Sequence, residues 1–298
     1  MFGSVRVMAR RSFLSRSAIQ TCHRMATAMV LFGVATALNT ASSNTASSQS
    51  PAPPGAEEEY GEFLARPKEL ASIPANDIAK SIRLNGGAML LGRKVYDKAC
   101  AGCHGADLKG STNLHTPDLT DADWRFSGDD LASGGNVKYP SDVEWTVRYG
   151  IRSGHPNARG LEADMLAYDP KYRTKEDTKE FGGGRFLTPE EVEDVVEYVL
   201  QISGQPADST KAARGDVLFH DGAKGNCFDC HGVDGTGSDP IGSTDLTQKR
   251  LYLWGSDRAS ILESINRGRR GVMPAFEGRL KPEEIKAVSV YVLSRAAR

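Results

Sequence analysis

The sequence has few aromatic residues, no long apolar run and almost no net charge. Aromatic side chains make up 7% of its 298 residues, and 37 basic and 38 acidic side chains give a formal charge of −1. This balance lacks the basic excess of nucleic-acid-binding proteins, so no nucleic-acid partner is expected. No segment keeps the apolar–polar alternation of a half-buried strand, which predicts an all-α fold.

The longest uncharged apolar stretch, Met25–Leu38, has 14 residues. A helix needs about 20 residues to cross a bilayer, so this stretch is too short. Residues 1–50 contain five arginines, all before the stretch, and no acidic residue. This order predicts a secretory signal peptide and low-complexity segment over 1–50, which includes Cys22, and then a disordered linker over 51–83. We therefore expect a periplasmic protein. The alternative is an uncleaved leader that anchors the chain to the periplasmic face of the inner membrane.

Cysteine is also scarce, and four of the five cysteines fall into two C-x-x-C-H motifs. The motifs are Cys100-Ala-Gly-Cys103-His104 and Cys227-Phe-Asp-Cys230-His231. C-x-x-C-H is the signature of c-type haem attachment. Its two thiols reach the two vinyl groups of the porphyrin, and the imidazole that follows takes the proximal axial position on the iron. We therefore predict two covalently bound haem c groups.

Two other kinds of site use C-x-x-C pairs. In a zinc ribbon the pairs stand about 15–20 residues apart, whereas His104 and His231 are 127 residues apart. A thioredoxin-like pair needs a βαβ context and no histidine. Haem attachment is therefore favoured over both.

The two motifs lie in two copies of one repeat. Each copy has a Gly-x-x-x-aromatic segment before the cysteines, an Asp-Leu-Thr segment 14 residues after the histidine, and a Pro-Glu-Glu helix start near its end. The matched residues are Gly92 with Gly215, Tyr96 with Phe219, Asp118 with Asp245, and Pro189 with Pro282. Duplication of one domain predicts two tandem domains, at 84–204 and 209–298, joined near Gly204-Gln-Pro206. The first copy carries a long insertion, from about Arg125 to Phe186.

Apolar spacing predicts the helices of each copy. Ala88–Cys100 and Lys211–Phe219 have the pattern of helices that lead into the two motifs. Thr188 is suited to be an N-cap and Pro189 a first-turn proline, so a helix is expected to start there, and Pro282 repeats this start.

The sixth iron ligand decides between electron transfer and chemistry at the iron. A methionine opposite the histidine raises the potential, and a six-coordinate iron has no open position for a substrate. Met273 follows His231 by 42 residues, within Val-Met-Pro-Ala, and is the candidate in the second copy. Met165, in the loop before the last helix of the first copy, is the candidate there. The alternatives in the first copy are Met89, His115 and His155.

The series Gly…Cys-x-x-Cys-His-Gly…Met-Pro…Tyr-Val resembles class I cytochrome c. More narrowly, residues 88–298 resemble the dihaem subunit III (CcoP/FixP type) of cbb3 cytochrome oxidases. The segments that carry this resemblance are Arg148-Tyr-Gly150-Ile151-Arg152, His155-Pro156-Asn157, Tyr252-Leu-Trp254-Gly255 and Gly271-Val-Met273-Pro274-Ala275. That subunit normally begins with a membrane helix, which the short leader here does not match. The chain therefore looks like a soluble relative, or a carrier for another complex.

The resemblance implies roles for named residues. The covalent attachment residues would be Cys100, Cys103, Cys227 and Cys230, and the axial ligands His104, Met165, His231 and Met273. It also implies that the first and last helices of each domain cross at aromatic pairs, Tyr96 with Tyr198 and Phe219 with Tyr291.

The function predicted from these features is that of a dihaem c-type cytochrome rather than an enzyme. It would carry electrons in the periplasm between a respiratory donor and a terminal oxidase or other acceptor. The expected partners are redox proteins, namely a quinol-side complex, a dehydrogenase or an oxidase. Membrane association is expected only through a partner or the uncleaved leader. Two alternatives stay open: a dihaem enzyme of the peroxidase or sulfur-compound oxidase type, which needs an open iron, and a fixed electron-transfer subunit of a dehydrogenase or oxidase complex.

Overall fold

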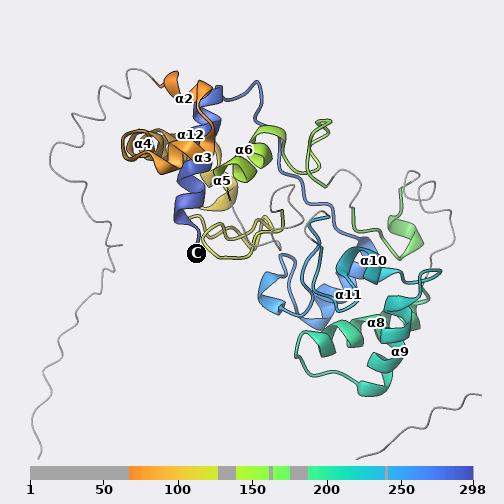
Figure 1. Cartoon of the computed structure of the whole chain (residues 1–298). Helices are drawn as coiled ribbons and strands as arrows, with labels where there is room; N and C mark the ends of the chain where they lie inside the picture. The colour runs from red at the N-terminus through yellow and green to blue at the C-terminus, as the bar shows by residue number, and fades with distance from the viewer. Residues whose placement is uncertain (1–66, 127–138, 161–163, 175–186, 239–240, 298) are drawn as a thin grey trace, which may run out of the picture. The chain divides into compact units, whose positions relative to one another are not determined.

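The computed structural model of the chain describes residues 67–126, 139–160, 164–174, 187–238 and 241–297 (Figure 1). The expected signal peptide with Cys22, and the linker up to residue 66, lie outside these ranges. Within them the regular elements are all helices, and the pairings of β type are isolated bridges. The predicted all-α fold is thus confirmed. No helix among the described residues is long and apolar enough to cross a membrane.

The helices form two groups, one around each C-x-x-C-H motif. The first group contains α2 (Glu69–Ser72), α3 (Ala75–Lys80), α4 (Ile82–Ala99), α5 (Ala101–His104), α6 (Pro140–Tyr149) and α12 (Pro282–Arg295). The second contains α8 (Pro189–Ile202), α9 (Ser209–His220), α10 (Cys227–His231) and α11 (Arg258–Arg267). Two short 3-10 turns, η2 (Pro170–Tyr172) and η3 (Lys249–Leu251), lie in the loops.

The start of α8 follows from its sequence as expected. The Thr188 hydroxyl accepts a hydrogen bond from the Glu191 N–H, and the Glu191 carboxylate accepts one from the Thr188 N–H (2.9 Å). This capping box and the first-turn proline satisfy donors that the helix itself leaves open. In α12 the Glu284 carboxylate accepts from the Lys281 N–H (2.8 Å) in the same way.

The closing helices of the two copies are exchanged. The last helix of the chain, α12, packs against α4, which leads into the first motif, while α8 packs against α9, which leads into the second. Figure 1 shows α12, in blue, among the orange helices from the start of the described chain. The sequence repeat at 84–204 and 209–298 therefore does not coincide with the packed groups, because each group is composed from both copies.

The aromatic residues at the helix crossings show the same exchange. The rings of Tyr96 and Tyr291 lie 5.7 Å apart, and those of Tyr198 and Phe219 lie 5.1 Å apart. The pairs implied by the resemblance, Tyr96 with Tyr198 and Phe219 with Tyr291, are therefore wrong. The connection between α8 and α9, residues 203–208, explains why: helices joined by so short a loop lie next to each other.

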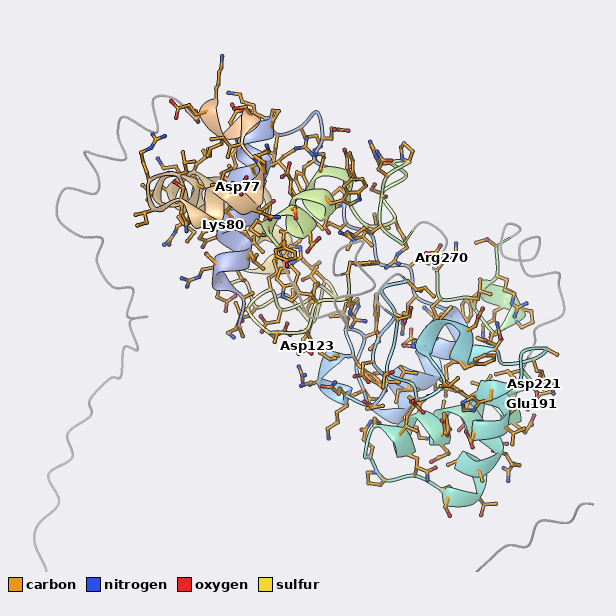
Figure 2. All side chains as sticks on the ribbon, viewed as in Figure 1. Asp77, Lys80, Asp123, Glu191, Asp221 and Arg270 are labelled. Atoms are coloured by element: carbon orange, nitrogen blue, oxygen red, sulfur yellow. The ribbon has the colours of Figure 1, made fainter. Side chains whose placement is uncertain are left out.

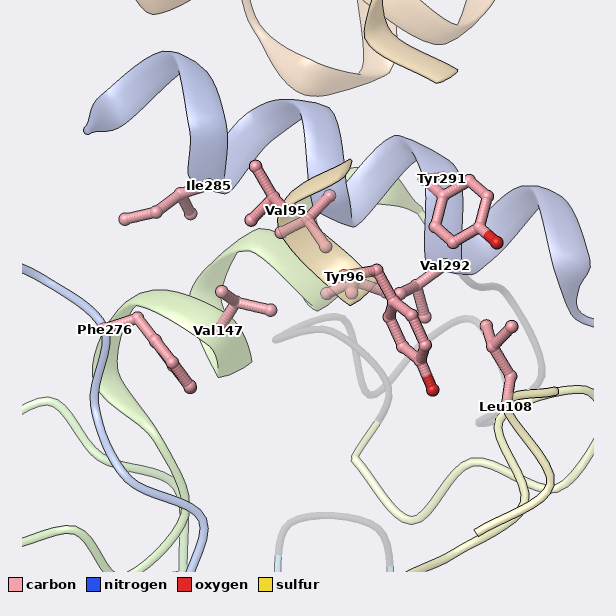
Figure 3. Close-up of a cluster of buried hydrophobic side chains, with 10 residues drawn as sticks. Val95, Tyr96, Leu108, Val147, Phe276, Ile285, Tyr291 and Val292 are labelled. Carbon is pink, nitrogen blue, oxygen red and sulfur yellow. The ribbon is translucent and has the colours of Figure 1, made fainter. Parts of the chain in front are cut away.

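Each group has its own apolar core. In the first group, α4, α6 and α12 bury side chains that meet Phe276 (Figure 3). The labelled members are Val95, Tyr96, Leu108, Val147, Phe276, Ile285, Tyr291 and Val292. In the second group, α8 and α11 supply Val192, Val195, Val196, Val199, Ile261 and Ile265.

Two segments differ from the sequence expectation. The expected linker over 51–83 is helical from Glu69 onward, and α2 and α3 pack on α12 through Leu70 and Ile78. The Lys286 ammonium, on α12, holds the end of α2 by donating to the carbonyls of Ala71 (2.9 Å) and Ile73 (2.6 Å). The expected insertion, about Arg125 to Phe186, contains α6, which is part of the first core and not an addition to it.

A valine at Gly215 is expected to destabilise the second group. A Cβ there would stand 2.0 Å from the Asp194 carbonyl oxygen, because α9 and α8 cross at this glycine. Overpacking of this kind costs about 1–3 kcal/mol, and more where backbone must move. Thermal unfolding of Gly215→Val should show the loss. Gly222→Ala is the control, because its Cβ would meet only the Asn226 side chain, at 3.7 Å. An unchanged unfolding temperature in Gly215→Val would contradict the crossing.

Candidate functional site

Each C-x-x-C-H motif stands on a short helix that follows a long one. Cys103 and His104 lie on α5, and Cys227, Cys230 and His231 lie on α10. Cys100, Cys103 and Cys227 are free thiols. Burial raises the pKa of the Cys100 and Cys227 thiols to about 11, so both are protonated near neutral pH. Each motif thus presents thiols one helical turn apart beside an imidazole.

The two histidines are held in a form that can bind a metal. Burial lowers the pKa of both His104 and His231, which favours neutral imidazole. The His231 Nδ1 lies 3.0 Å from the Thr244 carbonyl oxygen, so Nδ1 carries the proton and Nε2 keeps its lone pair for a ligand bond. His104 faces the backbone of Pro117, the residue at the position of Thr244, and this interaction offsets part of the effect of burial on its pKa.

The loop after each histidine is fixed by the same bonds in both copies. Thr116 Oγ1 donates to the Cys103 carbonyl, and Ser243 Oγ donates to the Cys230 carbonyl, both at 2.6 Å. The Asp-Leu-Thr segments then close an Asx turn. Asp118 accepts from the Thr120 N–H at 2.7 Å, and Asp245 accepts from the Thr247 N–H at 2.8 Å. The repeated segment is therefore a turn that returns the chain past the histidine.

The two methionines that the sequence singles out lie on matching segments. Met273 pairs with Ile151 after α6, with both backbone bonds at 3.0 Å. Met165 pairs with Arg269 after α11, at 3.3 and 3.0 Å. Each segment therefore runs along the end of a helix from the other copy of the repeat.

A glycine after each of these helices makes the close approach possible. A Cβ on Gly150 would stand 2.4 Å from the Met273 carbonyl oxygen, and one on Gly268 would stand 2.2 Å from the Met165 carbonyl oxygen. Both glycines also have positive φ, at 77° and 70°. These glycines were not among the expected functional residues. Their matching places in the two copies are the signal that would have found them.

The structure groups each methionine with the opposite motif. Met273 packs against the core that contains Cys100, and Met165 packs against the core that contains Cys227. The sequence expectation, with Met165 completing the first site and Met273 the second, is therefore wrong in its pairing. Met273 lies at the core beside the first motif, and Met165 lies at the core beside the second.

The alternative sixth ligands are engaged elsewhere. Met89, on α4, packs between the first core and the cap made by α2 and α3. His115 Nδ1 lies 2.9 Å from the Leu253 carbonyl, and its ring stacks on Trp254. His155 stacks on Tyr149, and its Nε2 lies 3.2 Å from a Glu277 oxygen.

These surroundings fit haem c better than a metal ion held by side chains alone. No group of three or more His, Cys, Asp or Glu side chains is arranged to hold a metal within the described ranges. Each site instead offers the cysteine motif, an imidazole whose pKa burial lowers, and a methionine that packs against the same apolar core. That is the donor set of an iron porphyrin bound by two thioether links and two axial ligands.

Two family models match the two copies of the repeat. The family model described as "Cytochrome C oxidase, cbb3-type, subunit III" matches residues 210–292, and the one described as "Cytochrome c" matches residues 89–203. A solved structure, the Kuenenia stuttgartiensis reducing HAO-like protein complex Kustc0457/Kustc0458, is 18% identical and covers 70% of this chain and 96% of its own. Its TM-score of 0.17 is too low to inform the fold.

Three curated relatives are similar over most of the chain. The cbb3-type cytochrome c oxidase subunit FixP of Bradyrhizobium sp. (strain ORS 278) is 38% identical over 76% of this chain and 67% of its own length. FixP of Bradyrhizobium diazoefficiens is 37% identical over the same shares. Subunit CcoP of Cereibacter sphaeroides is 35% identical, again over 76% and 67%. The chain therefore belongs to the FixP/CcoP family, subunit III of cbb3-type cytochrome c oxidases, and is a cytochrome c with covalently bound haem.

Proposed function

We propose that this chain carries two haem c groups and passes electrons between a respiratory donor and a terminal oxidase, without being an enzyme itself. The first haem would be linked to Cys100 and Cys103, with His104 and Met273 as axial ligands. The second would be linked to Cys227 and Cys230, with His231 and Met165. Bound haem supplies a one-electron couple between ferrous and ferric iron.

The observation that supports this proposal is that one candidate methionine packs against the core beside each motif, Met273 beside the first and Met165 beside the second. A thioether stabilises ferrous iron and raises the potential, and it fills the position that a substrate would need. The peroxidase-type alternative requires that position to be open at one iron. A methionine packs against the core at both sites, so the carrier function is favoured.

The side chains around each site have separate tasks. The buried valines and aromatic rings of each core exclude water, which limits the reorganisation that an electron transfer requires. The Thr244 carbonyl keeps the proton of His231 on Nδ1, so Nε2 would be free to bind the haem iron. The isolated bridges at Met165 and Met273 hold the backbone of each methionine at a helix end, and Gly268 and Gly150 allow this close approach.

The partner and location follow from the relatives. The relatives are named as subunits of cbb3-type oxidases, so the acceptor we propose is the catalytic part of such an oxidase, on the periplasmic face of the inner membrane. The donor would be another redox protein. In this arrangement the chain is a fixed subunit or a carrier that docks reversibly.

Spectroscopy of the purified holoprotein tests the carrier function. We expect two haems per chain by mass spectrometry and pyridine haemochrome assay, with both ferric haems low-spin. Carbon monoxide should leave both ferrous spectra unchanged, because neither iron has a free position. Membranes lacking the chain should regain donor-dependent oxygen uptake when it is restored. Rapid binding of carbon monoxide to one haem would instead support the enzyme alternative.

A further inference from the structure

Arg125 reaches from the first helix group to the second. Its neighbour Trp124 packs against the first core. The Arg125 guanidinium donates to Thr244 Oγ1 and to the Leu251 carbonyl (2.5 Å), both in loops that follow the second motif. This side chain thus links the loop of one haem site to that of the other.

Arg125 contacts the residue that is hydrogen-bonded to His231, the proposed axial ligand. Thr244 is the residue whose carbonyl accepts the hydrogen bond from His231 Nδ1, at 3.0 Å. A guanidinium bound to the Thr244 side chain therefore fixes the acceptor that orients the imidazole. It also brings a full positive charge close to the second haem.

Among the described residues, this charge has no carboxylate partner. The hydrogen-bond acceptors of Arg125 are neutral oxygens, and no described carboxylate lies within ion-pair distance of it. Burial lowers its pKa, and the charge of Arg152 adds to this, while Asp121 offsets a part. Arginine nevertheless stays protonated in proteins, so the charge persists in a poorly solvated place.

A second arginine in the same region provides a contrast. Arg250 also links the two groups, through an ion pair of 2.5 Å with Asp123, which is labelled in Figure 2. It is exposed and its charge is paired. Screening by water and by the carboxylate makes its field at the iron weak.

The first site has no counterpart of this contact. Pro117 follows His104 by 13 residues, as Thr244 follows His231. Proline has no hydroxyl to accept from a guanidinium, so the contact that Arg125 makes with Thr244 cannot be repeated at Pro117. The two sites are therefore matched in ligands and unequal in charge.

We propose that Arg125 is a positioning residue for the second haem, and that its positive charge raises the reduction potential of that haem above the value its ligands alone would give. A nearby cation disfavours the ferric state, which carries one more positive charge than the ferrous state. This inference rests on the proposed haem at Cys227, Cys230 and His231.

Redox titration of three variants of the full-length holoprotein tests the proposal. In Arg125→Gln we expect the ratio of ferrous to ferric second haem at a fixed potential to fall about tenfold, which is about 59 mV for a one-electron couple. Arg125→Lys should keep most of the wild-type value, because the charge remains. Arg250→Gln, the matched control, should leave both potentials unchanged. The component of the second haem is identified as the one that persists when Cys100 and Cys103 are both replaced by alanine.

The outcomes separate this inference from the proposed function. Two haems in Arg125→Gln with an unshifted second potential, or a shift that Arg125→Lys does not reverse, would overturn the inference and leave the carrier function intact. If Arg125→Gln does not assemble, Arg125→Met replaces it. Failure of both neutral variants to take up haem would assign Arg125 to folding and likewise overturn the inference. A wild-type chain without a second haem would instead overturn the proposed function.

Discussion

A chain that ends at Leu280, and so lacks α12, is expected to lose the haem at Cys100 and Cys103 and to keep the haem at Cys227 and Cys230. The lost segment is the C-terminal helix, which in the sequence stands in the same copy as the second motif. In the structure it supplies Ile285, Val288, Tyr291 and Val292 to the first core. Without this helix α4 loses its partner at Gly92, where a Cβ would stand 2.3 Å from the Ala287 carbonyl oxygen, and the first site opens to water. Peptide mapping by mass spectrometry would show which motif carries haem.

Two point variants, one in each closing helix, control for general misfolding of the shortened chain. Val288 and Val195 occupy matching helices, α12 and α8, and are 0% and 1% exposed. An unpaired carboxylate buried at either position costs roughly 3–5 kcal/mol. Val288→Asp should reduce occupancy of the first haem, and Val195→Asp that of the second. Loss of the same haem in both variants would contradict the exchange of closing helices.

Replacing Met273 with alanine is expected to turn the haem at Cys100 and Cys103 high-spin and to leave the other haem unchanged. The physical reason is the loss of a strong-field thioether, which leaves water or no ligand in the sixth position. About half of the charge-transfer band of methionine-ligated ferric haem should disappear, and one haem should begin to bind carbon monoxide. Met165→Ala should have the same effect on the haem at Cys227 and Cys230.

Met89→Leu serves as the control for these variants. Met89 lies beside the first core but on the far side of α4, against the cap formed by α2 and α3. A swap of similar volume there costs little. The charge-transfer band should stay at its full strength. A loss of half the band in Met89→Leu would return Met89 to the set of axial ligands and remove Met273 from it.

Much of the site could be predicted from the sequence because it is local. C-x-x-C-H places two thiols and an imidazole on one helical turn by covalent spacing alone. The capping residues around Pro189 and Pro282 likewise fix where helices begin. Residue type singles out the two candidate methionines, whereas their position relative to each motif predicts the opposite pairing from the one in the two cores.

The pairing of the helices could not be predicted from the same patterns. The repeat gives α8 and α12 nearly the same start, so each has a face that suits either α4 or α9. What decides between them is the length of the connections, since the short loop at 203–208 brings α8 onto α9 and leaves α12 for α4. Gly204-Gln-Pro206 lies in this short loop, so it joins two helices of one core and does not separate two domains.

Arg125 lay at the edge of a supposed insertion and carried no recognisable motif. Its contacts with Thr244 and Leu251 join segments more than one hundred residues apart in the sequence. Such a contact depends on how the copies interlock, so a pattern within one copy cannot reveal it.

The most direct test of the interlocked arrangement uses a chain in which Cys227 and Cys230 are both alanine, so that it holds a single haem at Cys100 and Cys103. The ferric spectrum of this chain is recorded with either methionine replaced by alanine. We expect the methionine charge-transfer band to survive Met165→Ala and to vanish in Met273→Ala. The opposite result, a band lost with Met165 and kept without Met273, would show that each copy of the repeat closes on itself and would contradict the exchange.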